Sequence, residues 1–231
     1  MSVSHKSSNA GRRPRLQSGD LTSRASLLQS ARKVFARKGF DAATIREVAE
    51  SARVNTAMIS YHFGGKMQLY HAVLSESFRE FDRIWEDPVF ASDAPAREKI
   101  RVYIEGFIRY QHANDDLRRI LSMEFASCGK HNRWLADEFF RHGYAHLAAI
   151  FREGMKRGEL KRVDPLFAIT GLVGMLLHPF ILRPLAEYIT KKRLNLGVRT
   201  FGEVITGMYL DGIAFQEKPG LGSHRTRRGA R

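Results

Sequence analysis

The sequence has almost no cysteine and no long hydrophobic run, and each shortage excludes a class of protein. Cys128 is alone among 231 residues, so no intrachain disulfide can form. We interpret Cys128 as a small apolar helix residue, with a redox-sensing thiol as the alternative. The longest apolar run, Leu172 to Leu182, is interrupted by His178 and Pro179 and is too short to span a bilayer. Because the basic N-terminus shows no secretory signal, we expect a cytoplasmic protein with no membrane partner.

Acidic residues are few relative to basic ones. The chain has 38 Lys and Arg against 24 Asp and Glu, which gives a formal net charge of +14. The excess lies at the two ends, with 13 basic against 6 acidic residues in 1–80 and 5 against 1 in 216–231. Residues 81–215 are nearly balanced, as in an ordinary folded domain. Such a charge distribution favours a polyanionic partner such as nucleic acid or an anionic membrane surface.

Strand patterns and enzyme motifs are also missing. We find no glycine loop for phosphate, no zinc-protease motif and no nucleophile constellation, so an enzyme is not favoured. Apolar residues instead recur at helical spacing in segments at about 22–38, 94–112, 115–128, 132–157, 164–182 and 198–215. Asp164-Pro165 is typical of a helix start. Apolar residues surround the helix that follows on nearly all sides, which predicts burial on more than one face.

Residues 44–63 carry the most specific pattern, that of two short helices joined by a tight turn. Thr44 followed by Glu47 predicts a capping box. The apolar face of the first helix comprises Ile45, Val48, Ala49 and Ala52, and that of the second comprises Met58, Ile59 and Phe63. Asn55 is expected to cap the second helix. Thr56, Ser60, Tyr61 and His62 are left facing outward, which suits insertion into a DNA major groove.

These residues resemble the TetR/AcrR-type transcriptional regulators over about residues 22–81. The resemblance rests on Ala31, Phe35 and Gly39, on Thr44–Ala49, on Ile59–Phe63, on Gly65-Lys66 and on Leu69-Tyr70. The stretch from Cys128 to Phe139 further resembles an AcrR-like subgroup. The resemblance implies an all-α homodimer, in which an N-terminal three-helix helix-turn-helix domain binds DNA. It also implies that a larger helical domain dimerises and holds a small-molecule effector.

The expected domain plan has four parts. A disordered basic arm at 1–20 precedes the DNA-binding domain at 21–65. The helical effector-binding and dimerisation domain follows at 66–215, and a disordered basic tail ends the chain at 216–231. The helix that begins near Lys66 is expected to run past residue 80 and link the two domains.

Eleven residues are predicted to form the DNA-binding site. Base reading is assigned to Thr56, Ala57, Met58 and Ser60, with Met58 turned into the core as the alternative. Arg46 is matched to a base or phosphate contact, or is a solvated charge. The remaining contacts, to phosphates or through helix caps, are Thr44, Arg53, Asn55, Tyr61, His62 and Lys66. Arg53 departs from the family, which usually has glycine there, so arginine would need another backbone conformation or tolerate modest strain.

The effector-binding residues are predicted from aromatic, sulfur-containing and polar side chains of the larger domain. They are Tyr103, Phe107, Met123, Glu124, Trp134, His146 and Met175, for which the alternative is ordinary core or surface. His142 and His146 have a spacing that zinc sites use, but no third ligand completes a set. We therefore expect neither a metal site nor a cofactor.

The most specific hypothesis is a sequence-specific repressor that a small-molecule effector of unknown identity releases from a palindromic DNA operator. Two copies would place two recognition helices in successive major grooves. The helices at about 164–182 and 198–215 would form a four-helix dimer interface. One alternative is a non-specific nucleic-acid packaging protein, given the basic ends, and the other is an enzyme with an incidental helix-turn-helix.

Overall fold

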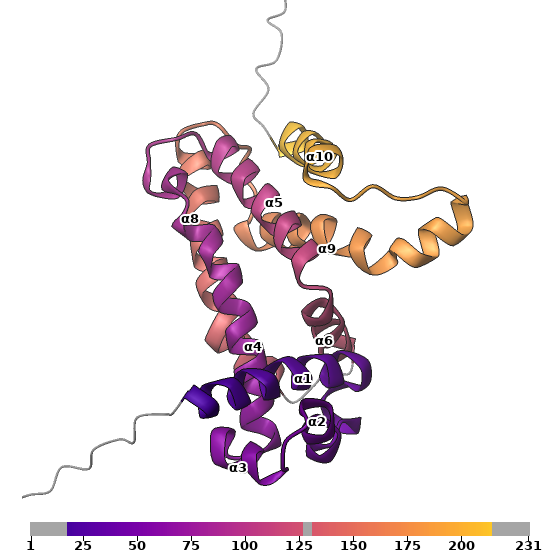
Figure 1. The fold of residues 1–231 in the computed structure, drawn as a ribbon. Coiled ribbons are helices and arrows are strands. Elements are labelled where there is room, and N and C mark those ends of the chain that lie inside the picture. The colour runs from indigo at the N-terminus through magenta and orange to yellow at the C-terminus, as the bar shows by residue number, and fades with distance from the viewer. Residues whose placement is uncertain (1–17, 127–130, 214–231) are drawn as a thin grey trace, which may run out of the picture. The chain divides into compact units, whose positions relative to one another are not determined.

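The computed structural model describes residues 18–126 and 131–213, and these residues are helical without a β-strand (Figure 1). The predicted all-α fold class is therefore confirmed. Residues 1–17 of the basic arm, Cys128 and the basic tail lie outside the described residues, whereas residues 18–20, expected to be disordered, begin the first helix. The chain divides into two compact units between Glu76 and Ser77, inside α4. Each unit is described by itself below.

The first unit is a bundle built from short helices. Its elements are α1 (Ser18–Ala42), α2 (Ile45–Ala52), α3 (Ala57–Phe63) and α4 (Lys66–Asp82) as far as Glu76. Its core holds Leu27, Ala31, Val34, Phe35, Val48, Ala49, Ile59, Leu69, Tyr70, Val73 and Leu74. Phe35 and Tyr70 meet edge to face with ring centroids 4.9 Å apart, so α4 belongs to this core as much as α1 does.

The first helix leaves helical geometry at Gly39, directly after the segment expected at about 22–38. Gly39 has φ 72° and ψ −178°, a conformation that side chains disfavour, and one further turn continues to Ala42. The capping box at α2 is confirmed: the Glu47 amide donates to Thr44 Oγ1 at 3.2 Å, and the Thr44 amide donates to Glu47 Oε2 at 3.0 Å. Ile45 was predicted on the buried face of α2 but is 37% exposed. It lies at the start of the helix, whereas Val48, about one turn later, is buried.

The turn between α2 and α3 depends on a left-handed residue. Arg53 has φ 56° and ψ 41°, and its amide donates to the carbonyls of Ala49 and Glu50. The following amide, of Val54, also donates to the Ala49 carbonyl at 3.0 Å. Arginine thus adopts the conformation for which glycine is the usual residue, and the turn closes as a helix C-cap. Asn55 Oδ1 then accepts the Ala57 amide at 2.8 Å, as predicted for a cap.

The second unit runs from Ser77 through eight further α-helical or π-helical segments and two short 3₁₀ helices among the described residues. They are η1 (Arg83–Glu86), η2 (Pro88–Ala91), α5 (Ala96–Ala113), α6 (Asp115–Ala126), α7 (Asn132–Leu135), η3 (Ala136–Phe140), α8 (Arg141–Lys156), α9 (Pro165–Thr190), η4 (Val198–Gly202) and α10 (Glu203–Ile213). Side chains from α5, α8, α9 and α10 form one core. Figure 1 shows α5, α8 and α9 packed together.

The helix α9 corrects two expectations. Asp164 caps it as predicted, since Oδ1 accepts the Leu166 amide at 2.8 Å, but it continues past residue 182 to Thr190. It continues through Pro179 and Pro184, and an ion pair from Arg183 to Glu187 at 3.0 Å lies in its last turns. By length and composition α9 is apolar enough to cross a membrane, contrary to the judgement that its apolar run is too short.

Burial of α9 is also one-sided rather than all round. Ala168, Ile169, Leu172, Leu176 and Phe180 pack into the core of the second unit. Phe167 is 75% exposed and Tyr188 is 72% exposed. In Figure 1 the C-terminal part of α9 extends away from α5 and α8 before the chain returns to α10. One chain alone therefore leaves much of the apolar surface of α9 uncovered.

The capping box predicts how acid destabilises the first unit. The hydrogen bond from Lys38, followed by those from Thr44, lowers the pKa of Glu47 from 4.5 to about 2. A carboxyl group whose pKa is lower in the folded protein than in the unfolded chain stabilises the fold. This stabilisation is fully present above pH 4.5 and is lost as the pH falls towards 2. We expect E47Q to lower the melting temperature at pH 7 but to match the unchanged chain at pH 2, measured by circular dichroism. E50Q removes an exposed carboxylate outside the box, and a pH profile like that of E47Q would contradict the assignment.

The left-handed residue predicts a substitution that stabilises the protein. Relief of the Cβ clash at Arg53 is expected to raise the free energy of unfolding of R53G by about 1 kcal/mol. R53A is the matched control, because it removes the guanidinium and keeps the strained Cβ. Urea unfolding of the three proteins separates the effects: a gain in R53A equal to that in R53G would mean that the backbone conformation is not the cause.

Candidate nucleic-acid interface

The recognition face of α3 is set by which of its side chains the first unit buries. Ile59 is fully buried, and the outward residues Thr56, Ala57, Ser60 and Tyr61 are exposed, Tyr61 by 63%. Figure 1 shows α3 and α2 beside each other in the same unit. Small side chains, two aliphatic hydroxyls and one phenol on an exposed helix face can contact base edges and phosphates. Four of the predicted residues therefore share one accessible face.

Two predicted contacts lie off this face. His62 is half-buried, and its Nε2 is buried with no hydrogen-bond partner among the described residues. Its ring meets Tyr61 edge to face with centroids 4.9 Å apart. The reason is helical periodicity, since His62 follows Ile59 by three positions and shares its side of the helix. The outward placement expected for His62 is thus wrong. Met58 is also half-buried and lies between the buried side and the exposed side of α3.

The helix α2 and its cap add two further predicted residues. Arg46 is exposed and makes no ion pair within the described part of the chain. The Thr44 hydroxyl is used twice in the capping box, accepting from the Glu47 amide and donating to Glu47 Oε2 at 3.0 Å. Arg46 is consequently available for a partner, whereas Thr44 already has a complete structural role. Asn55 resembles Thr44 in this respect, because its Oδ1 is occupied by the cap of α3.

Lys66 begins α4 and is held in place within the first unit. Its Nζ donates to the Asp41 carbonyl at 3.1 Å and lies 4.6 Å from the centre of the Phe40 ring. The ammonium therefore has a fixed position with donor capacity left over, since an ammonium carries three N–H groups. Its assignment to a phosphate contact remains a prediction, as do the assignments of Arg53 and the other residues of the face.

One cation near α3 was not found from the sequence. The guanidinium of Arg24, on α1, lies 5.1 Å from the centre of the Phe63 ring at the end of α3. Arg24 and Phe63 are far apart in the chain and belong to different helices, so the residue pattern of one helix could not predict their contact. Arg24 adds a positive charge beside the C-terminus of the recognition helix.

The predicted effector residues come together only in part: Tyr103 adjoins Phe107, and Trp85 stacks on both Tyr103 and His146. Tyr103 and Phe107 are buried in the core, and burial raises the pKa of the Tyr103 phenol. Glu124 is buried and accepts the His131 amide at 3.0 Å, so it belongs to a local structural contact. Met123, Trp134 and Met175 are partly buried, and His146 is exposed. These side chains come from five helices and share no described cavity.

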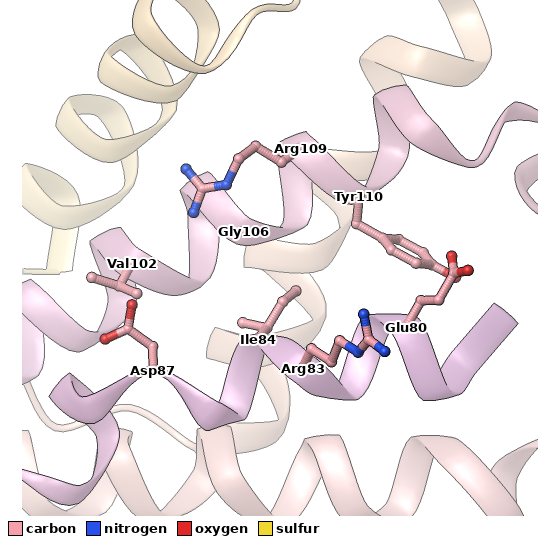
Figure 2. A pocket seen from close by; sticks show the side chains of 8 residues that line it. All are labelled: Glu80, Arg83, Ile84, Asp87, Val102, Gly106, Arg109 and Tyr110. Atoms are coloured by element: carbon pink, nitrogen blue, oxygen red, sulfur yellow. The ribbon is translucent and has the colours of Figure 1, made fainter. Parts of the chain in front are cut away.

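The described cavity lies on another face of α5. It has a volume of about 280 Å³ and is lined by Glu80, Arg83, Ile84, Asp87, Val102, Gly106, Arg109 and Tyr110 (Figure 2). None of the seven predicted effector residues lines it. The reason is again helical phase: Val102, Gly106 and Arg109 share one side of α5, and Tyr103 and Phe107 share the side that faces the core. Tyr110 is fixed by its hydroxyl, which donates to the Ser77 carbonyl at 2.7 Å.

Both parts of the chain match family models. Residues 27–73 match the model described as bacterial regulatory proteins of the tetR family. Residues 93–179 match the model described as a tetracycline-repressor-like C-terminal domain. The first range contains α2, α3 and the helices that pack on them, and the second contains α5 to α8 and half of α9.

Curated relatives and solved structures agree with these models. The chain is 27% identical over 67% of its length to a probable helix-turn-helix transcriptional regulator, YttP, of Bacillus subtilis (strain 168), of which the match covers 75%. It is 29% identical over 52% of its length to the transcriptional repressor NicS of Pseudomonas putida, of which the match covers 55%. The solved structure of FadR from Bacillus subtilis in complex with stearoyl-CoA has the same fold, with a TM-score of 0.66 and 19% identity over 82% of this chain and 98% of that one.

The order of the helices, the capped turn before an exposed recognition helix, the two family models and the relatives all lead to one assignment. The chain belongs to the TetR family of DNA-binding transcriptional regulators.

Proposed function

We propose that this protein is a homodimeric repressor that binds a palindromic operator through α3 and Arg46 and leaves it when a small molecule binds the second unit. The accessible face of Thr56, Ala57, Ser60 and Tyr61 carries the proposal. Repression is supported by relatives such as NicS, which is named a repressor. The role is one of binding, carried out in the cytoplasm on chromosomal DNA.

A dimer is supported by apolar surface that one chain leaves uncovered. Phe167 is 75% exposed on α9, and Met208 is 66% exposed on α10. The two helices are tied together, because the Tyr209 hydroxyl donates to the Ala168 carbonyl at 2.5 Å. A two-fold axis at this pair would bury the exposed side chains of both copies in a four-helix arrangement. The same axis would give two recognition helices and hence a palindromic operator.

A small-molecule effector is supported by the second unit and by the solved relatives. FadR from Bacillus subtilis holds stearoyl-CoA, so this fold accommodates a ligand with a long apolar chain in that protein. In this chain the cavity lined by Arg83, Arg109 and Ile84 offers cations beside an apolar floor. An effector releases DNA only to the extent that it binds the DNA-incompetent conformation more tightly.

Substitutions on the recognition face separate the regulator from a packaging protein. Once the protected operator has been found by footprinting, we expect R46A to weaken operator binding by about 1–3 kcal/mol and S60A to reduce discrimination against scrambled DNA. R152A removes an equally exposed cation from α8 and serves as the control for net charge. Fluorescence anisotropy at fixed salt measures both affinities. Equal losses on operator and scrambled DNA in all three variants would instead favour non-specific packaging.

The dimer interface has its own test. F167E places a charge on the exposed surface of α9, and we expect it to convert a dimer into a monomer because burial of an unpaired carboxylate is unfavourable. Y61E places the same charge on an equally exposed aromatic in the first unit and is expected to remain dimeric. Sedimentation velocity at micromolar protein measures both. A dimer that survives F167E together with M208E would place the interface elsewhere.

A further inference from the structure

Two histidines on α8 form a pair that the regulator function does not use. His142 and His146 are one helical turn apart, and their Nε2 atoms are 3.0 Å from each other. The rings are nearly perpendicular, with an interplanar angle of 82° and centroids 4.4 Å apart. Both residues are exposed, so an ion from solvent can reach the two nitrogens. No other two of the nine histidines in the sequence are four positions apart.

Neighbouring residues fix the pair and give it a negative counter-charge. Trp85 of η1 stacks on the His146 ring at 4.8 Å with an interplanar angle of 17°. Burial raises the pKa of Asp82, at the end of α4. Electrostatic interactions with the imidazoles of His142 and His146 oppose that rise. Burial, followed by the neighbouring His142, lowers the pKa of His146. The two rings therefore sit beside one carboxylate, against an aromatic support.

The two nitrogens are close enough to bind one metal ion. With metal–nitrogen bonds of about 2.0–2.1 Å, a right angle at the metal places two ligand nitrogens about 2.9 Å apart, and a tetrahedral angle places them about 3.4 Å apart. In the metal-free pair the nitrogens are 3.0 Å apart, a hydrogen-bond distance, so a small rotation of the rings reaches either separation. Right angles between imidazole ligands are typical of the square-planar or tetragonal sites of Cu²⁺ and Ni²⁺, and zinc prefers the wider angle.

We propose that His142 and His146 chelate one Cu²⁺ or Ni²⁺ ion through their Nε2 atoms, with Asp82 supplying negative charge across the site. In the free pair one Nε2–H donates to the other Nε2. On binding, that hydrogen bond breaks, the proton moves to Nδ1 of the same ring through solvent, and both Nε2 lone pairs bind the ion. No protons are released overall, and water completes the coordination.

The site differs from a closed structural metal centre. Within the described residues no group of three or more His, Cys, Asp or Glu side chains is arranged to hold a metal ion. The proposal is therefore a two-nitrogen chelate, which predicts reversible binding to the folded chain. Copper should bind more tightly than nickel, following the general order of divalent affinities.

Trp85 provides the measurement, because it contacts the His146 ring. The chain has two tryptophans, so W134F leaves Trp85 as the sole indole fluorophore. We expect CuCl₂ added to untagged W134F protein, in a buffer that does not bind metals, to quench this fluorescence saturably at one ion per chain. NiCl₂ should do the same at higher concentration. DNA is absent from the assay, so failure of the proposed regulator function would leave this result unchanged.

Variants decide whether the pair is responsible. H142A in the W134F background keeps the stack of His146 on Trp85 and removes one ligand, and we expect it to weaken copper binding by about tenfold or more. D82N should weaken binding less, and H178A, an exposed histidine on α9, should not weaken it. Circular dichroism verifies the fold of each variant. Copper binding by H142A as tight as by W134F, or no saturable quenching in the parent, would overturn the proposal.

Discussion

The burial of Ile59 is the constraint on which the DNA-binding surface depends. A seven-residue helix has too few backbone hydrogen bonds to hold itself in water, so its orientation comes from what it packs against. Ile59 is fully buried in the first unit, and with a period of 3.6 residues this leaves Ala57, Ser60 and Tyr61 on the opposite side. A helix rotated by one residue would expose a hydrophobic side chain and turn the serine hydroxyl inward.

The turn before α3 determines where that helix starts. The left-handed Arg53 ends α2, and the Asn55 side chain begins α3 two residues later. Both ends are specified by backbone hydrogen bonds that the turn must satisfy, which is why the family usually has glycine at this position. An arginine there retains the geometry at a cost in strain, and strain of this size persists when the surrounding contacts over-determine the conformation.

Local signals in the sequence predicted most of the fold, because caps and periodicity are local properties. Thr44 with Glu47, Asn55 and Asp164-Pro165 mark helix starts that the structure contains, and Gly39 marks a break in helical geometry within α1. The exposed side of α9 was missed because hydrophobicity does not tell whether a surface is covered by its own chain or by a second copy. The cavity was not predicted for a related reason. Aromatic composition directed the effector prediction, which stays a prediction, to Tyr103 and Phe107, whereas the cavity is lined by the small Gly106 and the charged Arg109 on another side of α5.

The helix α4 belongs to both units, and this limits how an effector can act. It begins at Lys66, held by the Asp41 carbonyl, and ends at Asp82, beside the histidine pair of α8. The helix is continuous over 17 residues, with Leu69 and Tyr70 in the core of the first unit and Ser77 to Asp82 in the second. A ligand that contacts only the second unit releases DNA only if it prefers a conformation of the protein that binds DNA less well. The free energy available for releasing DNA is bounded by that preference, so tight binding alone does not make a ligand an inducer.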